Sequence, residues 1–317
     1  MALQRVAVIG ASGFIGRYVV KRLAACGTAV AAIQRDVDAA KFLVPMGDVG
    51  QIARISVDIA DERRLAAALA GADALVSLVG ILHETGRRSF EAVHHHGAAR
   101  IGRLAAAAGV RRVVHVSALG ADPGATAAYL RSKAAGETAL RAAYPMAVIL
   151  RPSVVFGPED DFFNRFARLA VRLPAVPLIG GGRTRFQPVY VGDVADAVMR
   201  ALDEPAAAGR IYELGGPRIY TFRRLIELVL AETHRRRFLV PVPAALLRLP
   251  AAILERLPNP PLTRDQLRML EHDSVVAPDA LTLADLGLAA TSIEAILPTY
   301  LDRYRRGGWF AAHRIEA

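Results

Sequence analysis

Short apolar segments alternate with longer amphipathic ones through the first half of the chain. Continuous apolar runs predict buried strands at Val6–Ile9, Ala29–Ile33, Ile52–Val57, Ala74–Val79, Val113–Val116 and Ala147–Leu150. Between them, helix-like patterns cover Phe14–Ala25, Glu62–Ala70, Phe90–Ala108 and Ala127–Ala143. Strands that are apolar throughout and separated by helices indicate a parallel sheet covered on both faces. Because such crossovers are right-handed, we expect an α/β fold with a doubly wound parallel sheet.

The pattern changes after Arg151-Pro152, where prolines and the run Gly180-Gly181-Gly182 mark irregular segments. Val189–Val191 and Ile211–Leu214 are apolar enough to add strands to the same sheet. We therefore expect a sheet domain over residues 1–155, to which 188–215 returns. Residues 156–187 and 216–317 are expected to form a smaller, irregular C-terminal lobe for a substrate or a partner.

A glycine-rich turn, Gly10-Ala-Ser-Gly13-Phe-Ile-Gly16, follows the first strand and opens the first helix. A chain that turns this sharply while a pyrophosphate approaches its backbone has little room for Cβ atoms, and a helix N-terminus attracts phosphate. The spacing is one residue wider than the usual dinucleotide fingerprint, but the strand–turn–helix setting is the one it requires. The turn predicts a dinucleotide-binding domain of the Rossmann type.

The end of the second strand distinguishes NADP from NAD. An NAD site usually has a carboxylate there for the ribose hydroxyl, whereas this strand ends in Ile33-Gln34-Arg35. Arg35 can clamp a 2′-phosphate, so NADP (NADPH) is favoured, although Asp36 leaves NAD open. Asp58, at the end of the third strand, is expected either to meet the adenine amine or to share helix capping with Asp61.

A Ser–Tyr–Lys set follows the fifth strand. Ser117 stands at the carboxyl end of that strand, and Tyr129 and Lys133 are spaced i, i+4 on one face of the next helix. A neighbouring ammonium favours the phenolate of a tyrosine, and a serine hydroxyl can polarise a carbonyl. We interpret Ser117, Tyr129 and Lys133 as candidate catalytic residues that also hold the nicotinamide ribose.

Composition sharpens this interpretation. The chain of 317 residues is 53% hydrophobic with a net charge of +10, yet of 40 basic residues only Lys21, Lys41 and Lys133 are lysines. Because arginine is the expected cation in this chain, a lysine four residues after Tyr129 favours a real site. The charge is spread along the chain without a basic arm, so nucleic acid is not an expected partner.

Cysteine usage and hydropathy place the protein in the cytoplasm. A single cysteine, Cys26, cannot form an internal disulfide, and the N-terminus carries no signal-peptide pattern. The most apolar stretch, Phe238–Leu257, is interrupted by prolines and charges, so no membrane span is expected. Arg235-Arg236-Arg237 precedes this stretch; it is expected either to contact anionic lipid or a partner, or to be a solvated cluster beside a core helix.

The glycine turn, Ser117 and Tyr129-x-x-x-Lys133 resemble the short-chain dehydrogenase/reductase superfamily. Leu150-Arg151-Pro152-Ser-Val-Val-Phe-Gly-Pro158 and Pro188-Val-Tyr-Val-Gly-Asp193 resemble its extended, epimerase-type branch. Pro45-Met-Gly-Asp48 and Gln187-Pro-Val-Tyr resemble an atypical branch of that superfamily. This branch contains the nucleotide-binding accessory subunit of respiratory complex I and its bacterial relatives.

This resemblance implies a tightly held NADPH in a largely structural role and docking on a larger membrane-bound assembly. The expected partners are complex I subunits or the membrane surface, and the expected location is the cytoplasm, at the cytoplasmic face of the inner membrane. Together with the turn and strand-end residues, it gives the expected cofactor contacts: Gly10, Ser12, Gly13, Phe14, Ile15, Gly16, Arg35, Asp58, Gly80, Tyr129, Lys133, Arg151 and Pro152.

One position departs from the superfamily. Active members commonly carry an asparagine on the helix before the fifth strand, where this chain has His94-His95-His96. Successive positions of an α-helix point about 100° apart, so the three histidines are not expected to bind one metal ion. The leading hypothesis is therefore an NADPH-binding accessory or assembly factor of the quinone-linked respiratory chain. The alternative is an active NAD(P)-dependent reductase or epimerase that uses Ser117, Tyr129 and Lys133.

Overall fold

The computed structural model of the chain describes residues 3–86, 88–257, 260 and 262–307. These residues divide into two compact units. Unit 1 contains the chain up to Pro152 together with Val191–Leu214 and Ala277–Ala289. Unit 2 contains Ser153–Tyr190, Gly215–Val276 and the segment that begins at Ala290.

Unit 1 is built on a seven-stranded parallel sheet in the order β11-β6-β5-β4-β1-β2-β3. Its strands are β1 (Arg5–Ile9), β2 (Ala29–Gln34), β3 (Ile52–Ser56), β4 (Ala74–Ser77), β5 (Arg112–Val116), β6 (Val148–Pro152) and β11 (Ile211–Leu214). The chain reverses its direction of winding between β1 and β4, and ligands of such sheets bind beyond the carboxyl ends of the strands at that point. The predicted doubly wound sheet is confirmed.

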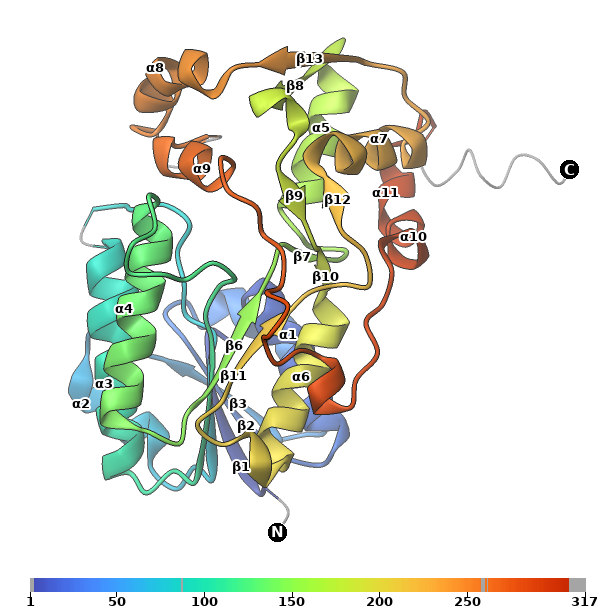
Figure 1. Cartoon of the computed structure of the whole chain (residues 1–317). Helices are drawn as coiled ribbons and strands as arrows, with labels where there is room; N and C mark the ends of the chain where they lie inside the picture. The colour runs from blue at the N-terminus through green and yellow to red at the C-terminus, as the bar shows by residue number, and fades with distance from the viewer. Residues whose placement is uncertain (1–2, 87, 258–259, 261, 308–317) are drawn as a thin grey trace, which may run out of the picture. The chain divides into compact units, whose positions relative to one another are not determined.

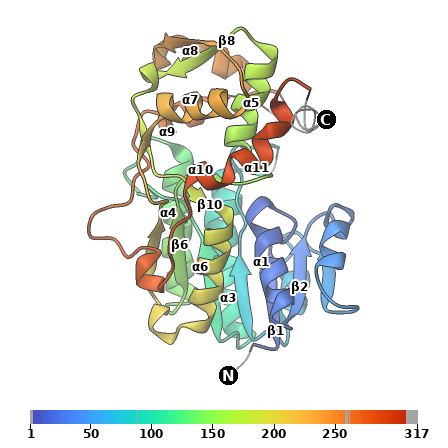
Figure 2. The ribbon, with the colours of Figure 1, turned by 90° about the vertical axis from the view of Figure 1, so that its right-hand side faces the viewer.

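Helices cover both faces of this sheet. Helices α1 (Phe14–Ala25) and α6 (Val191–Asp203) pack on one face, and α2 (Glu62–Leu69), α3 (Gly97–Ala107) and α4 (Ala128–Ala143) on the other (Figures 1 and 2). Arg22 of α1 and Asp196 of α6 form an ion pair with Nε and Oδ1 2.5 Å apart. Short 3-10 turns complete the unit: η1 (Asp38–Met46), η4 (Pro205–Ala207) and η5 (Ala284–Leu286).

The helix expected over Phe90–Ala108 begins differently from the prediction. Its first part, η2 (Glu91–His96), is a π-helical turn, and α3 continues from it. Side chains cap the entry: the Phe90 amide donates to Glu84 Oε1 at 2.7 Å, and the Ala92 amide donates to Ser89 Oγ at 3.0 Å. Hydrophobic periodicity does not reveal a change from i→i+4 to i→i+5 hydrogen bonding within one turn, and π-turns occur often at functional sites.

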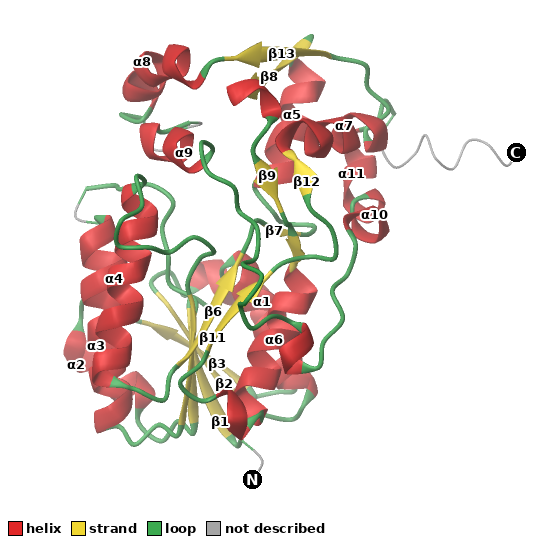
Figure 3. Ribbon diagram, in the orientation of Figure 1, coloured by secondary structure: helices red, strands yellow, loops and turns green. Residues whose placement is uncertain are grey.

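In unit 2 the described strands pair two by two. The pairs are β7 (Val155–Phe156) with β10 (Val189–Tyr190), β9 (Arg185–Phe186) with β12 (Tyr220–Thr221), and β8 (Ala175–Ile179) with β13 (Phe238–Val242). The expectation that Val189–Val191 joins the central sheet is therefore wrong, whereas Ile211–Leu214 joins it as β11. The helices are α5 (Phe162–Arg172), α7 (Phe222–Glu232), α8 (Ala244–Leu254), α9 (Arg264–Met269), α10 (Ile293–Ile296) and α11 (Pro298–Leu301), with 3-10 turns η3 (Gly180–Gly182) and η6 (Asp302–Tyr304) (Figure 3).

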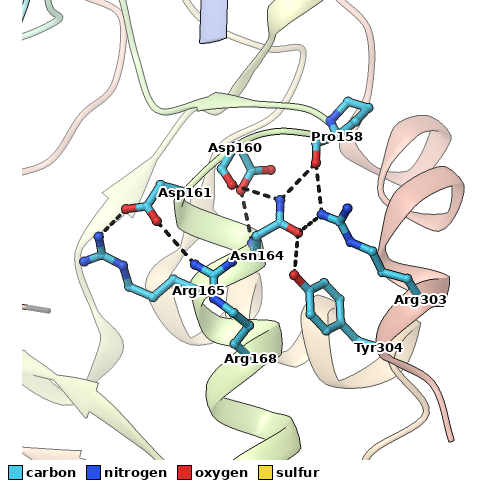
Figure 4. Close-up of polar contacts among 8 residues, drawn as sticks. All are labelled: Pro158, Asp160, Asp161, Asn164, Arg165, Arg168, Arg303 and Tyr304. Atoms are coloured by element: carbon cyan, nitrogen blue, oxygen red, sulfur yellow. Dashed lines mark hydrogen bonds and ion pairs between the residues drawn. The ribbon is translucent and has the colours of Figure 1, made fainter. Parts of the chain in front are cut away.

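A buried polar cluster fastens the start of α5 to η6 within unit 2 (Figure 4). Asn164 Nδ2 donates to the Asp160 carbonyl at 2.9 Å, and Asn164 Oδ1 accepts from the Tyr304 hydroxyl at 2.9 Å and from Arg303. The Tyr300 hydroxyl donates to Asp160 Oδ2 at 2.5 Å. Burial raises the pKa of the Asp160 carboxyl, against the lowering effect of this hydrogen bond. Asn164 is thus a structural residue of the smaller unit.

The apolar stretch 238–257 forms β13 and α8. Helix α8 buries Ala251 completely, but its opposite side exposes Leu246, Leu249 and Ile253. The preceding arginines are largely structural: Arg235 Nη2 donates to the Tyr304 carbonyl at 2.9 Å, and Arg237 Nε donates to the Ala170 carbonyl at 2.7 Å. Among the described residues, no helix is both long and apolar enough to cross a bilayer.

Candidate functional site

The glycine turn is fixed by close backbone contacts. Gly10 has φ of +85°, and its amide donates to the Ile33 carbonyl at 2.9 Å. A Cβ on Gly16 would lie 2.3 Å from the Gly10 carbonyl oxygen, so a side chain at this position would force the turn apart. The Gly13 amide closes the turn by donating to Gly10 at 3.0 Å. These contacts hold the start of α1 at the carboxyl end of β1, as the fingerprint predicts.

The N-terminus of α1 can bind an anion. Its N-cap, Gly13, has an extended backbone and supplies no side-chain cap, and the first turn carries no acidic residue. Gly13 is exposed, and Ser12, Phe14 and Ile15 beside it are partly exposed. The first amides of a helix lack partners within the helix and carry the positive end of its dipole. A dinucleotide pyrophosphate is the ligand that this arrangement suits.

Charged side chains gather where β2 and β3 end. Asp36 is engaged in local structure, because its Oδ1 accepts from the amides of Asp38 and Ala39 at 2.9 and 3.1 Å. Burial lowers the pKa of Arg88, and repulsion from Arg35 lowers it further, while Asp58 opposes both effects. Arg88 is therefore within range of the charges on Arg35 and Asp58. Sequence reasoning identified Arg35 and Asp58 but missed Arg88, which follows β4 rather than β2.

Asp58 also has a local role. Its Oδ1 accepts from the Ala60 amide at 2.9 Å, and Asp61 caps α2 by accepting from the Arg64 amide at 3.0 Å. The capping alternative therefore holds for Asp61. Asp58 is exposed and retains a second carboxylate oxygen that can accept a hydrogen bond from a ligand.

Two buried polar side chains at the carboxyl edge of the sheet have no hydrogen-bond partner within the described chain. They are Gln34, the last residue of β2, through both amide atoms, and Ser117, after β5, through its hydroxyl. Their exposed fractions are only 7% and 4%. A buried polar group left unpaired costs about 1–3 kcal/mol, so such groups in native structures commonly face a ligand or an ordered water. Their positions fit a bound dinucleotide.

Lys133 is buried beneath the end of β5. Its Nζ donates to the Val116 carbonyl at 3.2 Å, and only 4% of the residue is exposed. Burial lowers the pKa of Lys133 to about 8, against the stabilising charge of Glu137. A Cβ on Gly80 would lie 3.4 Å from Nζ, so the absence of a side chain there leaves room above the ammonium. The structure thus brings Lys133 and Gly80 together, with Ser117 next to Val116 in the chain.

Tyr129 lies in the first turn of α4, one turn before Lys133. Its ring packs edge-to-face against His94 and Phe90, with ring centroids 5.4 and 5.9 Å apart. Burial raises the pKa of Tyr129 to about 12. The phenol is consequently neutral at physiological pH and can donate a hydrogen bond.

His94 is the buried member of the three consecutive histidines His94-His95-His96. Its Nδ1 lies 2.8 Å from Ser132 Oγ, and its Nε2 accepts from the Ile81 amide at 3.0 Å. Ser132 Oγ also donates to the Tyr129 carbonyl at 2.7 Å, so the proton between His94 and Ser132 belongs to Nδ1. Burial and repulsion from Lys133 lower the pKa of His94 to about 3. The imidazole is neutral, and both ring nitrogens are occupied.

Arg151 and Pro152, both expected cofactor contacts, end strand β6. The Arg151 guanidinium is paired with Glu137 at 2.7 Å and with Glu213 at 3.6 Å. The Pro152 carbonyl accepts from the Leu119 amide at 2.9 Å. The Arg151 side chain thereby links α4, β6 and β11, and through Glu137 it influences the charge environment of Lys133.

A second buried histidine was not identified from the sequence. His115, on β5, is 4% exposed, and its Nδ1 lies 3.1 Å from Ser77 Oγ on β4. Burial lowers the pKa of His115 to about 3. Within an apolar strand a lone histidine gives no periodic signal, so only the structure shows this neutral imidazole beneath the site.

The glycine turn, the open N-terminus of α1 and the Ser–Tyr–Lys set on one sheet edge define a nucleotide-binding α/β protein with the NAD(P)-binding fold. The chain belongs to the NAD dependent epimerase/dehydratase family, whose sequence profile matches residues 6–215. Resemblance to the extended branch of the short-chain dehydrogenases is thereby confirmed.

Individual members of this family are similar to the chain over most of its length. The chain is 36% identical to NADH dehydrogenase [ubiquinone] 1 alpha subcomplex subunit 9, mitochondrial, of Arabidopsis thaliana, over 95% of this chain and 78% of that protein. It is 35% identical to the Mus musculus protein of the same name, over 98% and 82% of the two chains. Among solved structures it is similar to MoeE5 in complex with UDP-glucose and NAD. That likeness has a TM-score of 0.73 and 20% identity and covers 94% of this chain and 97% of the other.

Proposed function

We propose that this protein holds NADPH as a structural ligand and serves as an accessory or assembly factor of respiratory complex I. Support for the partner comes from relatives that are named as subunits of NADH dehydrogenase [ubiquinone] and match nearly the whole chain. Support for the structural role of the nucleotide comes from the site itself. The single observation that carries it is the occupation of both His94 nitrogens next to Tyr129 and Lys133.

Bound NADPH supplies a hydride, but turnover also needs a proton that moves to the substrate and is replaced from solvent. In this chain His94 donates through Nδ1 and accepts through Nε2 within the protein, so it has no free nitrogen to pass a proton. The Lys133 ammonium donates one hydrogen bond to the Val116 carbonyl. The residues around Tyr129 are thus suited to binding a nucleotide and excluding water. They offer no evident route by which a proton could exchange with solvent.

The choice of NADPH over NADH rests on Arg35 and Arg88. Two guanidinium groups near the ends of β2 and β3 offer charge-assisted hydrogen bonds to a 2′-phosphate. Asp36, the carboxylate that would favour NAD, already accepts two backbone hydrogen bonds. Asp58 remains available for the adenine amine.

The alternative function is an active NAD(P)-dependent reductase or epimerase. One observation favours it: the buried Ser117 hydroxyl has no partner within the described chain, as expected of a group that orients a substrate carbonyl. In that case Tyr129 would be the proton donor and Lys133 would lower its pKa once the ligand is bound.

The test is to identify the bound nucleotide. The protein is purified without added cofactor and denatured, and the released ligand is quantified by chromatography. The proposal predicts about one NADPH or NADP⁺ per chain, retained through dialysis. Protein that carries no nucleotide and binds NADPH no more tightly than NADH would contradict it.

For location, we propose peripheral binding at the cytoplasmic face of the inner membrane through the α8 face, defined as Leu246, Leu249, Ile253 and Leu257. These side chains are between 50% and 73% exposed, and the first three lie on one side of the helix. The nearby carboxylates, Glu255 and Glu271, are paired with Arg264 and Arg248 at 2.5 and 3.3 Å. An apolar face without uncompensated negative charge suits an anionic bilayer surface.

Flotation with anionic liposomes tests this face. The triple variant Leu246→Ser/Leu249→Ser/Ile253→Ser is expected to lose most of the vesicle-bound fraction. A matched triple variant, Val49→Ser/Met146→Ser/Ile219→Ser, removes equally exposed apolar side chains elsewhere and is expected to float like wild type. Equal flotation of both variants, or none by wild type, would contradict membrane binding through α8 and would favour a protein partner for this face.

A further inference from the structure

The three histidines do not have the α-helical spacing that would point their side chains about 100° apart. Glu91–His96 is a π-turn, in which residue i lies beneath both i+4 and i+5. Glu91 is therefore a neighbour of His95 and His96 at once, while His94 points to the other side, into the protein. Adjacent histidines that would diverge on an α-helix here share one carboxylate.

The donor atoms of these three side chains converge. His95 Nδ1 lies 2.5 Å and His96 Nε2 3.4 Å from the same atom, Glu91 Oε1. The two imidazole rings are 5.1 Å apart, and one ligand atom from each residue falls within 4.8 Å of the others. All three side chains are at least partly exposed, so an ion can reach them without opening the fold.

We propose that Glu91, His95 and His96 form a binding site for a divalent transition metal ion, with Zn²⁺ as the representative ligand. Two imidazole nitrogens and one carboxylate oxygen are a donor set that Zn²⁺, Co²⁺ and Ni²⁺ accept, with water in the remaining positions, whereas Mg²⁺ and Ca²⁺ prefer oxygen alone. The ion would replace the hydrogen bond between His95 and Glu91 and draw His96 closer to the shared carboxylate.

The proposed metal site lies on the same turn as His94, so a bound ion would affect the position of His94. His94 contacts Tyr129 and Ser132 from the inner side of the turn, and the proposed ligands stand on its outer side. An ion that crosslinks Glu91 to His95 and His96 would hold the turn in its π-helical form and so hold His94 in place. Metal and nucleotide should then strengthen each other's binding, because linkage between two sites is reciprocal.

Titration of tag-free, metal-stripped protein with Zn²⁺ and Co²⁺ tests the site. We expect one ion per chain with micromolar affinity and, for Co²⁺, visible absorption bands of a low-coordinate N/O site. The variants His95→Ala/His96→Ala and Glu91→Gln are each expected to weaken binding about tenfold or more. The control His272→Ala, an exposed histidine of unit 2, is expected to bind like wild type.

Thermal unfolding of each variant in EDTA confirms that it is folded. Wild-type binding no tighter than that of the double variant, or equal loss in the His272→Ala control, would overturn the proposal. This result is independent of the proposed function, because metal binding is measured directly and requires neither NADPH nor complex I.

Discussion

His94 and Ser132 are joined by a hydrogen bond of 2.8 Å that connects the π-turn to helix α4, which carries Tyr129 and Lys133. The same imidazole accepts from the Ile81 amide in the loop after β4 and stacks on Phe90 with ring centroids 5.5 Å apart. One neutral side chain thus joins three segments around the expected nicotinamide position. We infer that His94 braces these three segments against one another.

Replacement of His94 by alanine should therefore destabilise the folded protein. The change leaves the Ile81 amide unpaired and removes the ring contacts with Phe90 and Tyr129, so the free energy of unfolding is expected to fall by about 2–4 kcal/mol. Urea unfolding in EDTA measures it. His95→Ala, a neighbour with a half-exposed ring, is the control and should cost less than about 0.5 kcal/mol. If His94→Ala lowers the free energy of unfolding no more than the control does, the imidazole does not brace these segments.

Gly136 allows α4 to approach the π-turn. A Cβ at this position would lie 2.3 Å from the His94 carbonyl oxygen, a backbone atom that cannot move alone. Gly136→Ala is expected to destabilise the protein by about 1–3 kcal/mol and to weaken nucleotide binding, despite the better helix propensity of alanine. In Gly97→Ala the one contact of the new methyl group below 3.0 Å is with the flexible end of Ile59, and the Ala92 carbonyl oxygen stands at an ordinary 3.5 Å, so the loss of stability should be smaller. Equal effects of both substitutions would contradict the close approach.

Arg35 and Arg88 are expected to distinguish the two dinucleotides. Alanine at either position should weaken NADPH binding about tenfold while NADH binding changes little, because only NADPH carries the 2′-phosphate. Isothermal titration of nucleotide-free protein gives both affinities. Arg64→Ala, which removes an exposed arginine of α2, serves as the control. If the affinities for NADPH and NADH fall equally, the arginines contribute a general electrostatic attraction and do not recognise the 2′-phosphate.

The buried His115 gives stability a defined pH dependence. Its pKa is about 3 in the folded protein against an ordinary value of 6.5, so below about pH 6.5 the unfolded chain binds the extra proton. Stability should fall with falling pH by up to about 1.4 kcal/mol per pH unit on this account, and it should be unaffected above pH 6.5. Urea unfolding of wild type and His115→Asn between about pH 6.5 and pH 5 compares the two slopes of stability against pH. Wild type should have the steeper slope, and an equal or steeper slope in the variant would contradict this.

The sequence was sufficient for the seven strands of the central sheet, although it wrongly added Val189–Val191 to that sheet. Apolar runs and the glycine turn predict the elements that carry Gly10, Tyr129 and Lys133, because local pattern determines those elements. The roles of these three residues in binding stay predictions. The π-turn was not predictable, since a single inserted residue per turn does not alter hydrophobic periodicity over a helix of this length. Arg88 was missed because it comes within range of the Arg35 charge only through the fold of the loop after β4. The exposed side of α8 was left open between a core helix and a surface for lipid or a partner, because apolar composition alone does not determine exposure.

The central claim is that this protein holds its nucleotide without turning it over. The most direct measurement follows the absorbance of NADPH bound to the intact protein after an excess of carbonyl or quinone acceptors is added. The account predicts that less than about one equivalent per chain is oxidised, and that Tyr129→Phe behaves like wild type. Multiple turnovers in wild type that disappear in Tyr129→Phe would contradict it and establish the alternative of an active reductase.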